Sequence, residues 1–242
     1  MAEVRHRPHQ IHYLRTLSGV VGMIRNPEGT DSVFDIEDGL RRSGATDSFL
    51  ERVRSLPGVS ALMAERYLAP PLDLDALAAM PAGSLGQALS GHLVEHGFDP
   101  DYYRKVEVVS DLDWVLMRMR QSHDIWHVVT GIGTDRVGEI ALKAFELAQT
   151  WRPMAAVITC GGLLRYLIKD PEQMGVVLAG IGHGYQLGHR AQPLLAQRWE
   201  LHWERPLTSW RQALGLPESP GCRPDERWTP GQPAFNPSRP SW

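Results

Sequence analysis

Apolar residues recur every three or four positions along most of the chain, the spacing that puts them on one face of an α-helix. There is no internal repeat and no clear set of alternating strands, so we expect an all-α fold with a single multi-helix domain. The predicted helices cover about 10–25, 32–43, 46–55, 59–66, 73–78, 84–96, 111–130, 135–149, 153–168, 171–189, 190–203 and 206–214.

Residues suited to helix termini support several of these boundaries. Short polar side chains that can cap a helix N-terminus stand at the expected starts: Asp31, Thr46 and Ser84, and Ser110 or Asp111. Gly131 is a natural C-terminal stop for the helix that begins near residue 111.

The last part of the chain differs in composition from the rest. Residues 217–242 hold seven prolines, which exclude a regular helix: Pro217, Pro220, Pro224, Pro230, Pro233, Pro237 and Pro240. We therefore expect a helical domain over 1–216 and a proline-rich tail over 217–242. The tail is either partly disordered or a strap that lays its aromatic residues on the domain or on a partner.

Composition narrows the class of protein. A hydrophobic fraction of 43% and a charged fraction of 22% are typical of a soluble globular chain, and a net charge of -3 argues against nucleic-acid binding through a basic surface. Two cysteines do not make a disulfide scaffold, and no apolar run reaches the length of a membrane span. The Arg- and His-rich start could imitate a mitochondrial presequence. Its helical spacing favours a first domain helix instead.

The stretch "QSHDIWHVVTGIGTDRVGEIA" sets polar side chains into an apolar helix pattern. At about 100° per residue, His123, Asp124 and His127 share an arc of about 100° on one helix. The turn "GIGT" follows this helix, and Glu139 lies about as many residues into the second helix as His127 lies before the end of the first. If the two helices pack as an antiparallel hairpin, two imidazoles and two carboxylates converge, which predicts a divalent metal site.

Other interpretations of these residues stay open. A buried hydrogen-bond network would also satisfy four such groups. A His-Asp dyad of metal phosphohydrolases would need further ligands, for which His92, His96 and Asp170 are available without specific spacing. Glu146, two turns beyond Glu139, is either a partner of the site or a solvated acid, and we favour the solvated acid.

The segment "HDIWHVVTGIGTDRVGEIALKAFELAQT" closely resembles the signature of the coenzyme Q biosynthesis protein 4 family: His-Asp-x-x-His, eleven residues, then Glu. Here the pattern falls on His123, Asp124, His127 and Glu139. "LDWVLMRMRQSHD" and "RWELHWERPLTSWRQALGL" are similar to the family's flanking helices, so the resemblance covers about 85–216.

The resemblance implies an all-helical, often dimeric protein of ubiquinone biosynthesis, associated peripherally with membranes. The implied substrate is a 4-hydroxybenzoate-derived ring with a polyprenyl tail, and the implied reaction is removal of the C1 carboxylate coupled to hydroxylation there. The alternative is a non-catalytic scaffold that holds lipid intermediates and organises other ubiquinone-biosynthesis enzymes. Mitochondrial members carry a presequence that this chain seemingly lacks, so we expect a bacterial, cytoplasmic protein, with a peripheral position on the inner membrane as an option.

Zn²⁺ is the metal that the resemblance implies. Zinc is redox-silent, and two histidines with a carboxylate also suit Fe²⁺, so an oxidative reaction leaves the metal open. Four protein ligands would close a tetrahedral site, whereas three leave an opening for catalysis. We therefore expect Asp124 or Glu139 to be a weak or exchangeable ligand.

A glycine stripe suggests where a polyprenyl tail could bind. Gly180, Gly184 and Gly188 are spaced by four residues and leave one helix face bare. This face either packs closely against another helix or forms a groove for the isoprenoid chain. Arg190, which follows, is a candidate for contacting a carboxylate or phosphate through two hydrogen bonds.

Overall fold

The computed structural model describes Gly22, Leu40 and residues 44–99 and 107–218. The α-helices are α3 Gly44–Ser55, α4 Val59–Ala64, α5 Leu74–Ala78, α6 Leu85–His96, α7 Asp111–Thr130, α8 Arg136–Thr150, α9 Pro153–Lys169, α10 Met174–Arg190 and α11 Leu207–Leu214. Short 3-10 turns are η1 Pro171–Gln173, η2 Leu194–Ala196 and η3 Trp199–Leu201. These residues contain no strand, so the predicted all-α fold is confirmed. Apart from Gly22 and Leu40, the helices predicted over 10–25 and 32–43 lie outside the described residues, as does the tail beyond residue 218.

Local capping explains most of the observed helix boundaries. Ser84 caps α6 by accepting a hydrogen bond from the backbone N–H of Gln87, and Ser110 forms a capping box with Asp113 at the start of α7. The prediction that Thr46 caps a helix is wrong. α3 already begins at Gly44, and the Thr46 hydroxyl instead donates to the carbonyl of Leu40 at 2.7 Å.

The continuous helix predicted over 190–203 is also wrong. Pro193 has no backbone N–H to donate, and the chain there forms η2 and η3. The Gln149 side chain on α8 satisfies the freed backbone groups: it accepts from the N–H of Leu194 at 3.1 Å and donates to the carbonyl of Gln192 at 3.0 Å. A long-range contact therefore overrides the local helical pattern.

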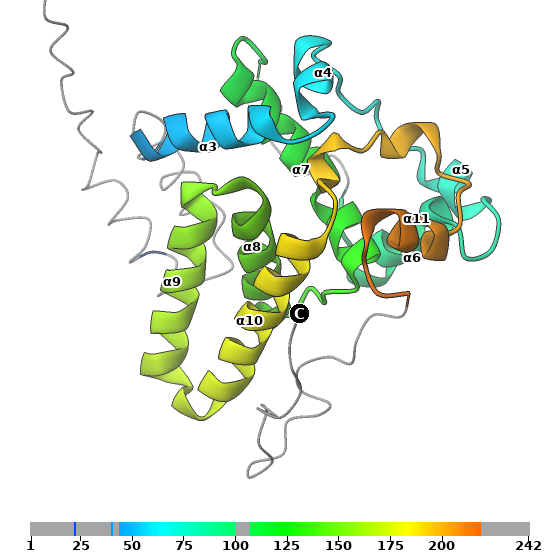
Figure 1. The fold of residues 1–242 in the computed structure, drawn as a ribbon. Helices are drawn as coiled ribbons and strands as arrows, with labels where there is room; N and C mark the ends of the chain where they lie inside the picture. The colour runs from blue at the N-terminus through cyan, green and yellow to red at the C-terminus, as the bar shows by residue number, and fades with distance from the viewer. Residues whose placement is uncertain (1–21, 23–39, 41–43, 100–106, 219–242) are drawn as a thin grey trace, which may run out of the picture.

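The helices form two groups that meet near the centre of the molecule (Figure 1). α8 packs chiefly along α9 and α10, whereas α7 packs against α6, α4 and α11. The Trp126 ring of α7 meets the Phe145 ring of α8 edge-on at 6.1 Å, and both side chains are buried. α7 and α8 therefore belong to different groups of helices and join them at the turn that connects the two.

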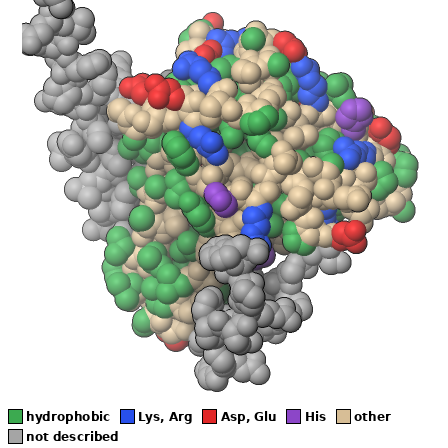
Figure 2. Space-filling view, in the orientation of Figure 1, with side chains coloured by type: hydrophobic (Ala, Val, Ile, Leu, Met, Phe, Trp, Pro, Cys, Tyr) green, Lys and Arg blue, Asp and Glu red, His purple; other side chains and the backbone are tan. Residues whose placement is uncertain are grey.

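One face of α9 is apolar and exposed. Figure 2 shows apolar side chains gathered over this helix, at the lower left of the view. Leu164, Leu167 and Ile168 are among the large exposed apolar residues, with 47%, 56% and 62% of their surface accessible. Within the described part of the chain, no helix combines the length and apolar character that crossing a bilayer requires.

Candidate metal centre

Helix caps place the site at the turn between α7 and α8. α7 ends at Gly131, whose φ of 72° reverses the chain direction. α8 begins after Asp135, whose Oδ1 accepts hydrogen bonds from two backbone N–H groups of the first turn, at 2.9 and 3.0 Å. A β-carbon on Gly138 would lie 2.0 Å from the carbonyl oxygen of Gly133, so only glycine fits there. This tight turn brings the end of α7 against the start of α8.

Three of the four predicted ligands come together at this turn. Ligand atoms of His123, His127 and Glu139 all lie within 4.8 Å of one another. Glu139 Oε1 is 3.1 Å from His127 Nε2, and Glu139 Oε2 is 3.7 Å from His123 Nε2. Two ligands bound at about 2.1 Å to one tetrahedral ion lie about 3.4 Å apart. The separations in this group, which we call the metal group, therefore fit a single divalent cation.

The surroundings of His127 fix which ring nitrogen carries the proton. Its side chain is 1% exposed, and Nδ1 lies 2.9 Å from the carbonyl oxygen of Ile132. A carbonyl only accepts hydrogen bonds, so Nδ1 is the donor and Nε2 presents a lone pair in the neutral ring. Nε2 is enclosed and has no aligned hydrogen bond, although Glu139 Oε1 is 3.1 Å away. In the neutral ring this lone pair faces a carboxylate, and a metal ion between the two would make Nε2 a ligand; without a metal, a second proton on the ring pairs it with Glu139.

Glu139 supplies the negative charge of the metal group. Burial alone would raise its pKa, but His127, His123 and Lys143 outweigh burial and lower the pKa to about 2. Burial likewise lowers the pKa of His127, and the contact with Glu139 more than reverses this, so the net shift is upward. The first turn of α8 also favours a negative charge through the helix dipole. The Glu139 side chain is 40% exposed, so this side of the site faces solvent.

Asp124 lies beside the metal group and not within it. Its Oδ1 is 3.4 Å from His123 Nδ1, on the opposite edge of the ring from the nitrogen that faces Glu139. A carboxylate in that position can orient a histidine and raise its basicity as a ligand. The sequence left open which acid would be the weaker ligand, and this geometry favours Asp124 for that role.

His92 on α6 approaches the metal group from a third helix. Its ring is stacked against that of His127, with centroids 6.0 Å apart and planes 21° from parallel. Burial, followed by the neighbouring His127 and His96, lowers the pKa of His92. The sequence suggested His92 only together with His96 and Asp170 in the phosphohydrolase alternative. Asp170 instead ends α9, outside the metal group.

The glycine stripe of α10 is filled by α8. A β-carbon on Gly184 would lie 2.0 Å from the carbonyl oxygen of Ala141, and one on Gly188 would lie 2.5 Å from the carbonyl oxygen of Phe145. On Gly180 it would meet the Val137 side chain at 2.9 Å. These contacts support close packing of two helices, and they argue against an open groove for an isoprenoid chain on this face.

Arg190 lies away from the metal group. The glycine contacts pair α10 with α8 in the same chain direction, with Gly180 beside Val137 and Gly184 beside Ala141. In that register Arg190 lies about eight residues, or roughly 12 Å, along the helix axis from Glu139. Its side chain is exposed, and the structure gives it no part in the site.

The expectation that Glu146 is a solvated acid is wrong. Its side chain is 4% exposed and accepts hydrogen bonds from Lys143 Nζ and from the Arg152 guanidinium, each at 2.9 Å. Burial raises its pKa, and the two cations outweigh burial and lower the pKa to about 2. Position on the helix indicated only that Glu146 points near Glu139. The packing of α8 on the rest of the protein decides that it is buried.

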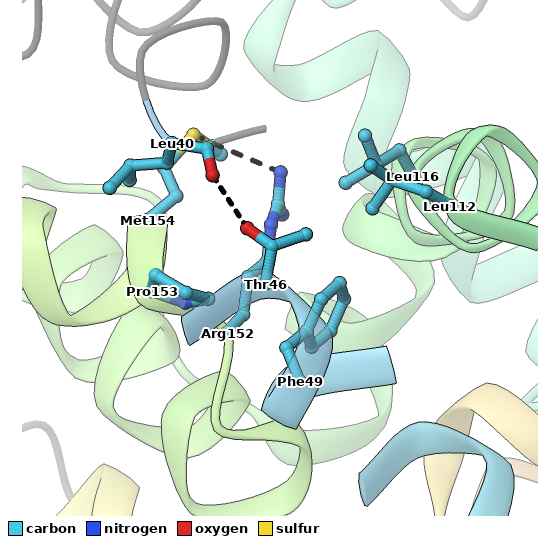
Figure 3. A pocket seen from close by; sticks show the side chains of 8 residues that line it. All are labelled: Leu40, Thr46, Phe49, Leu112, Leu116, Arg152, Pro153 and Met154. Atoms are coloured by element: carbon cyan, nitrogen blue, oxygen red, sulfur yellow. Dashed lines mark hydrogen bonds between the residues drawn. The ribbon is translucent and has the colours of Figure 1, made fainter. Parts of the chain in front are cut away.

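A separate pocket lies near the start of α3 (Figure 3). It is lined by Leu40, Thr46, Phe49, Leu112, Leu116, Arg152, Pro153 and Met154. Its charged member, Arg152, already donates to Glu146. None of the metal group lines it, so the pocket offers no reactive group beside the proposed ligands.

Comparison with known proteins shows which family the chain belongs to. A family model described as coenzyme Q (ubiquinone) biosynthesis protein Coq4 matches residues 51–220, which is most of the chain. The chain belongs to the Coq4 family. The match includes α7, the turn and α8, and thus all residues of the metal group.

Individual Coq4 relatives match over the same region. A mitochondrial COQ4 homolog of Danio rerio is 33% identical over 174 residues, 70% of this chain and 64% of that protein. The mitochondrial COQ4 of Pyricularia oryzae is 32% identical over 65% of this chain and 52% of that protein. The chain therefore spans between about half and two thirds of the length of these curated relatives.

A solved structure shares the fold. The crystal structure of a candidate ubiquinone biosynthesis protein from Nostoc punctiforme aligns with a TM-score of 0.77 and 32% identity. The alignment covers 85% of this chain and 99% of that one. The helical architecture described above is therefore an architecture of the Coq4 family.

The expected location, a bacterial cytoplasm with an optional position on the inner membrane, is contradicted. The curated Coq4 relatives from Danio rerio, Pyricularia oryzae and Yarrowia lipolytica are all named as mitochondrial proteins. The prediction used the helical spacing of the first residues to set aside an import presequence. Presequences are themselves amphipathic and rich in arginine, so that spacing does not distinguish the two.

Proposed function

We propose that this Coq4-family chain is a metal-dependent enzyme of ubiquinone biosynthesis. His123, His127 and Glu139 bind one divalent cation. The substrate is a polyprenylated, 4-hydroxybenzoate-derived ring, whose C1 carboxylate leaves as carbon dioxide while a hydroxyl group takes its place. This is a two-electron oxidation, in which water supplies the hydroxyl oxygen and dioxygen accepts the two electrons and leaves as hydrogen peroxide. The observation that carries this proposal is the enclosed, unpaired Nε2 of His127 facing a carboxylate in a three-ligand group with one exposed side.

The chain's own residues supply binding and proton handling. A bound divalent metal supplies positive charge that holds a substrate oxygen and stabilises negative charge on the ring. Ile132 holds His127 in the tautomer that presents Nε2. Glu139, on the exposed side, balances the charge of the cation, and Asp124 is the acid available to orient His123 or to move a proton.

Zn²⁺ is the first choice of metal and Fe²⁺ the second. Both accept two imidazoles and a carboxylate, and zinc does not itself change oxidation state. With zinc, the electron-rich ring must react with dioxygen directly. Metal analysis of the protein purified from its own host distinguishes the two ions.

A second candidate function is a non-catalytic scaffold, a homodimer that binds polyprenyl intermediates and other biosynthetic enzymes. The exposed apolar face of α9, with Leu164, Leu167 and Ile168, favours this candidate, since such a face suits a lipid or protein partner. In a scaffold the metal would stabilise the fold without turnover.

One experiment separates the two functions. The metal-loaded protein is given a prenylated 4-hydroxybenzoate-derived substrate and dioxygen, and carbon dioxide is measured. Release that disappears in His127→Ala but persists in His183→Ala, which alters an exposed histidine of α10, supports the enzyme. Tight substrate binding without carbon dioxide release supports the scaffold.

A further inference from the structure

His92 is held rigidly beside the metal group by the end of α6. Gly97, at φ 64°, ends this helix and turns the chain so that the Phe98 ring lies edge-on to His92 at 6.0 Å and is stacked on His96 at 5.3 Å. His96 lies within hydrogen-bond distance of the backbone carbonyl of His92, at 2.9 Å from Nδ1. The His92 ring is therefore fixed between this aromatic cluster and His127.

The Nε2 atom of His92 is enclosed and has no hydrogen-bond partner. Among the described residues, the only buried histidine nitrogens in that condition are His92 Nε2 and His127 Nε2, and they belong to two rings stacked on each other. A buried polar atom without a partner is costly, and proteins usually supply the partner as a bound water, ion or ligand. Two such atoms on adjacent rings point to partners from outside the chain, a cation at His127 Nε2 and an oxygen atom beside it at His92 Nε2.

We propose that His92 is a positioning residue, whose Nε2 hydrogen-bonds an oxygen atom that the metal group holds from outside the chain. This inference rests on the proposed function, because it takes the His127 nitrogen to be a metal ligand. The space around His92 Nε2 is closed, so the partner reaches it with a single small atom, such as one oxygen of an aromatic carboxylic acid. His92 thereby orients the acid over the metal without binding the metal itself.

The test uses Co²⁺, whose visible spectrum reports changes in its ligands, and two probe ligands, 4-hydroxybenzoate and acetate. The variants are His92→Phe, which removes the nitrogens but keeps a ring, and His92→Gln, which keeps an N–H. His183→Gln, which alters an exposed histidine of α10 away from this cluster, is the control. All proteins should bind Co²⁺ with similar affinity and the same spectrum before ligand is added.

His92→Phe should weaken the binding of 4-hydroxybenzoate about 10-fold, as expected for the loss of one hydrogen bond to a charged group. His92→Gln should recover part of this loss, and His183→Gln should match the unaltered protein. An equal loss for acetate places the hydrogen bond on a carboxylate oxygen, and a loss confined to 4-hydroxybenzoate places it on the phenol oxygen. Unchanged binding of both probes to His92→Phe overturns the inference.

Three further outcomes also overturn it, and they separate its failure from that of the proposed function. If His92→Phe loses Co²⁺ itself, then His92 acts on the metal and not on its ligand. If the unaltered protein binds no Co²⁺, the proposed metal function fails first. If the unaltered protein binds Co²⁺ but its spectrum responds to neither probe, the metal group is supported and the proposed role of His92 is wrong.

Discussion

Two glutamates of α8 present the same charge in different surroundings. Glu139 and Glu146 lie on one helix, and neighbouring groups lower the pKa of each to about 2. Glu146 is 4% exposed and accepts well-formed hydrogen bonds from two cations. Glu139 is 40% exposed and faces imidazole nitrogens, one of which has no aligned hydrogen bond.

The comparison shows that a lowered pKa does not identify a functional acid. At Glu146, Lys143 and Arg152 donate hydrogen bonds and the carboxylate accepts them, so the network is complete and holds α8 to the start of α9. At Glu139, the neutral His127 ring donates through Nδ1 to the Ile132 carbonyl and leaves Nε2 without an aligned hydrogen bond to the carboxylate. The incomplete arrangement, and not the strength of the charge, marks the site that needs a cation.

Replacing Glu146 should have the largest effect on folding. In Glu146→Gln, Lys143 and Arg152 stay buried without their carboxylate, and we expect a loss of about 3 kcal/mol in the free energy of unfolding at neutral pH. Urea denaturation measures this loss. Affinity for Zn²⁺ should stay within about 3-fold of the original, in keeping with a structural role. A change in stability below about 1 kcal/mol would contradict the role of this network.

Lowering the pH should cause the same loss in the free energy of unfolding of the unaltered protein. The pKa of Glu146 is about 2 in the folded chain and 4.5 when unperturbed, so its stabilisation is complete above pH 4.5 and is lost as the pH falls toward 2. This shift corresponds to about 3 kcal/mol. Between pH 4.5 and pH 2, the free energy of unfolding of Glu146→Gln should therefore fall by about 3 kcal/mol less than that of the unaltered protein. An unchanged acid branch in Glu146→Gln would show that other groups control acid unfolding.

Replacing His127 should weaken metal binding. Loss of a partner outside the ligand shell already costs about 10- to 100-fold in affinity, so His127→Ala should weaken Zn²⁺ binding by at least about 100-fold. Competition with a chromophoric chelator measures this, with His183→Ala as the control. Near-normal affinity in His127→Ala would mean that His127 is not a ligand.

Replacing Asp124 should have the smallest effect of the four. Because Asp124 contacts His123 from outside the metal group, Asp124→Asn should weaken Zn²⁺ binding by about 10-fold. The same competition assay compares it with Glu139→Gln, which should lose far more. Equal losses in the two variants would place Asp124 among the direct ligands.

Much of the fold followed from local sequence signals. Helical spacing, with the caps at Ser84 and Ser110 and the glycine stop at Gly131, predicted α6, α7 and α8 within one residue at each end, because these signals act over a few helical turns. The helical spacing gave a wrong prediction where a side chain from a distant part of the chain hydrogen-bonds the backbone. The helix predicted over 190–203 is broken by Pro193 and bonded instead to Gln149.

For the site, the sequence alone determined that His123, His127 and Glu139 lie near one turn, since helical periodicity and a short connection fix their angles and heights. The structure decided the rest. The turn itself placed the Ile132 carbonyl against His127 Nδ1, five residues away, and left Asp124 outside the group, whereas tertiary packing brought in His92 from α6 and buried Glu146. The physical reason is range: helix geometry depends on hydrogen bonds four residues apart, whereas burial and the approach of α6 depend on contacts between segments far apart in the chain.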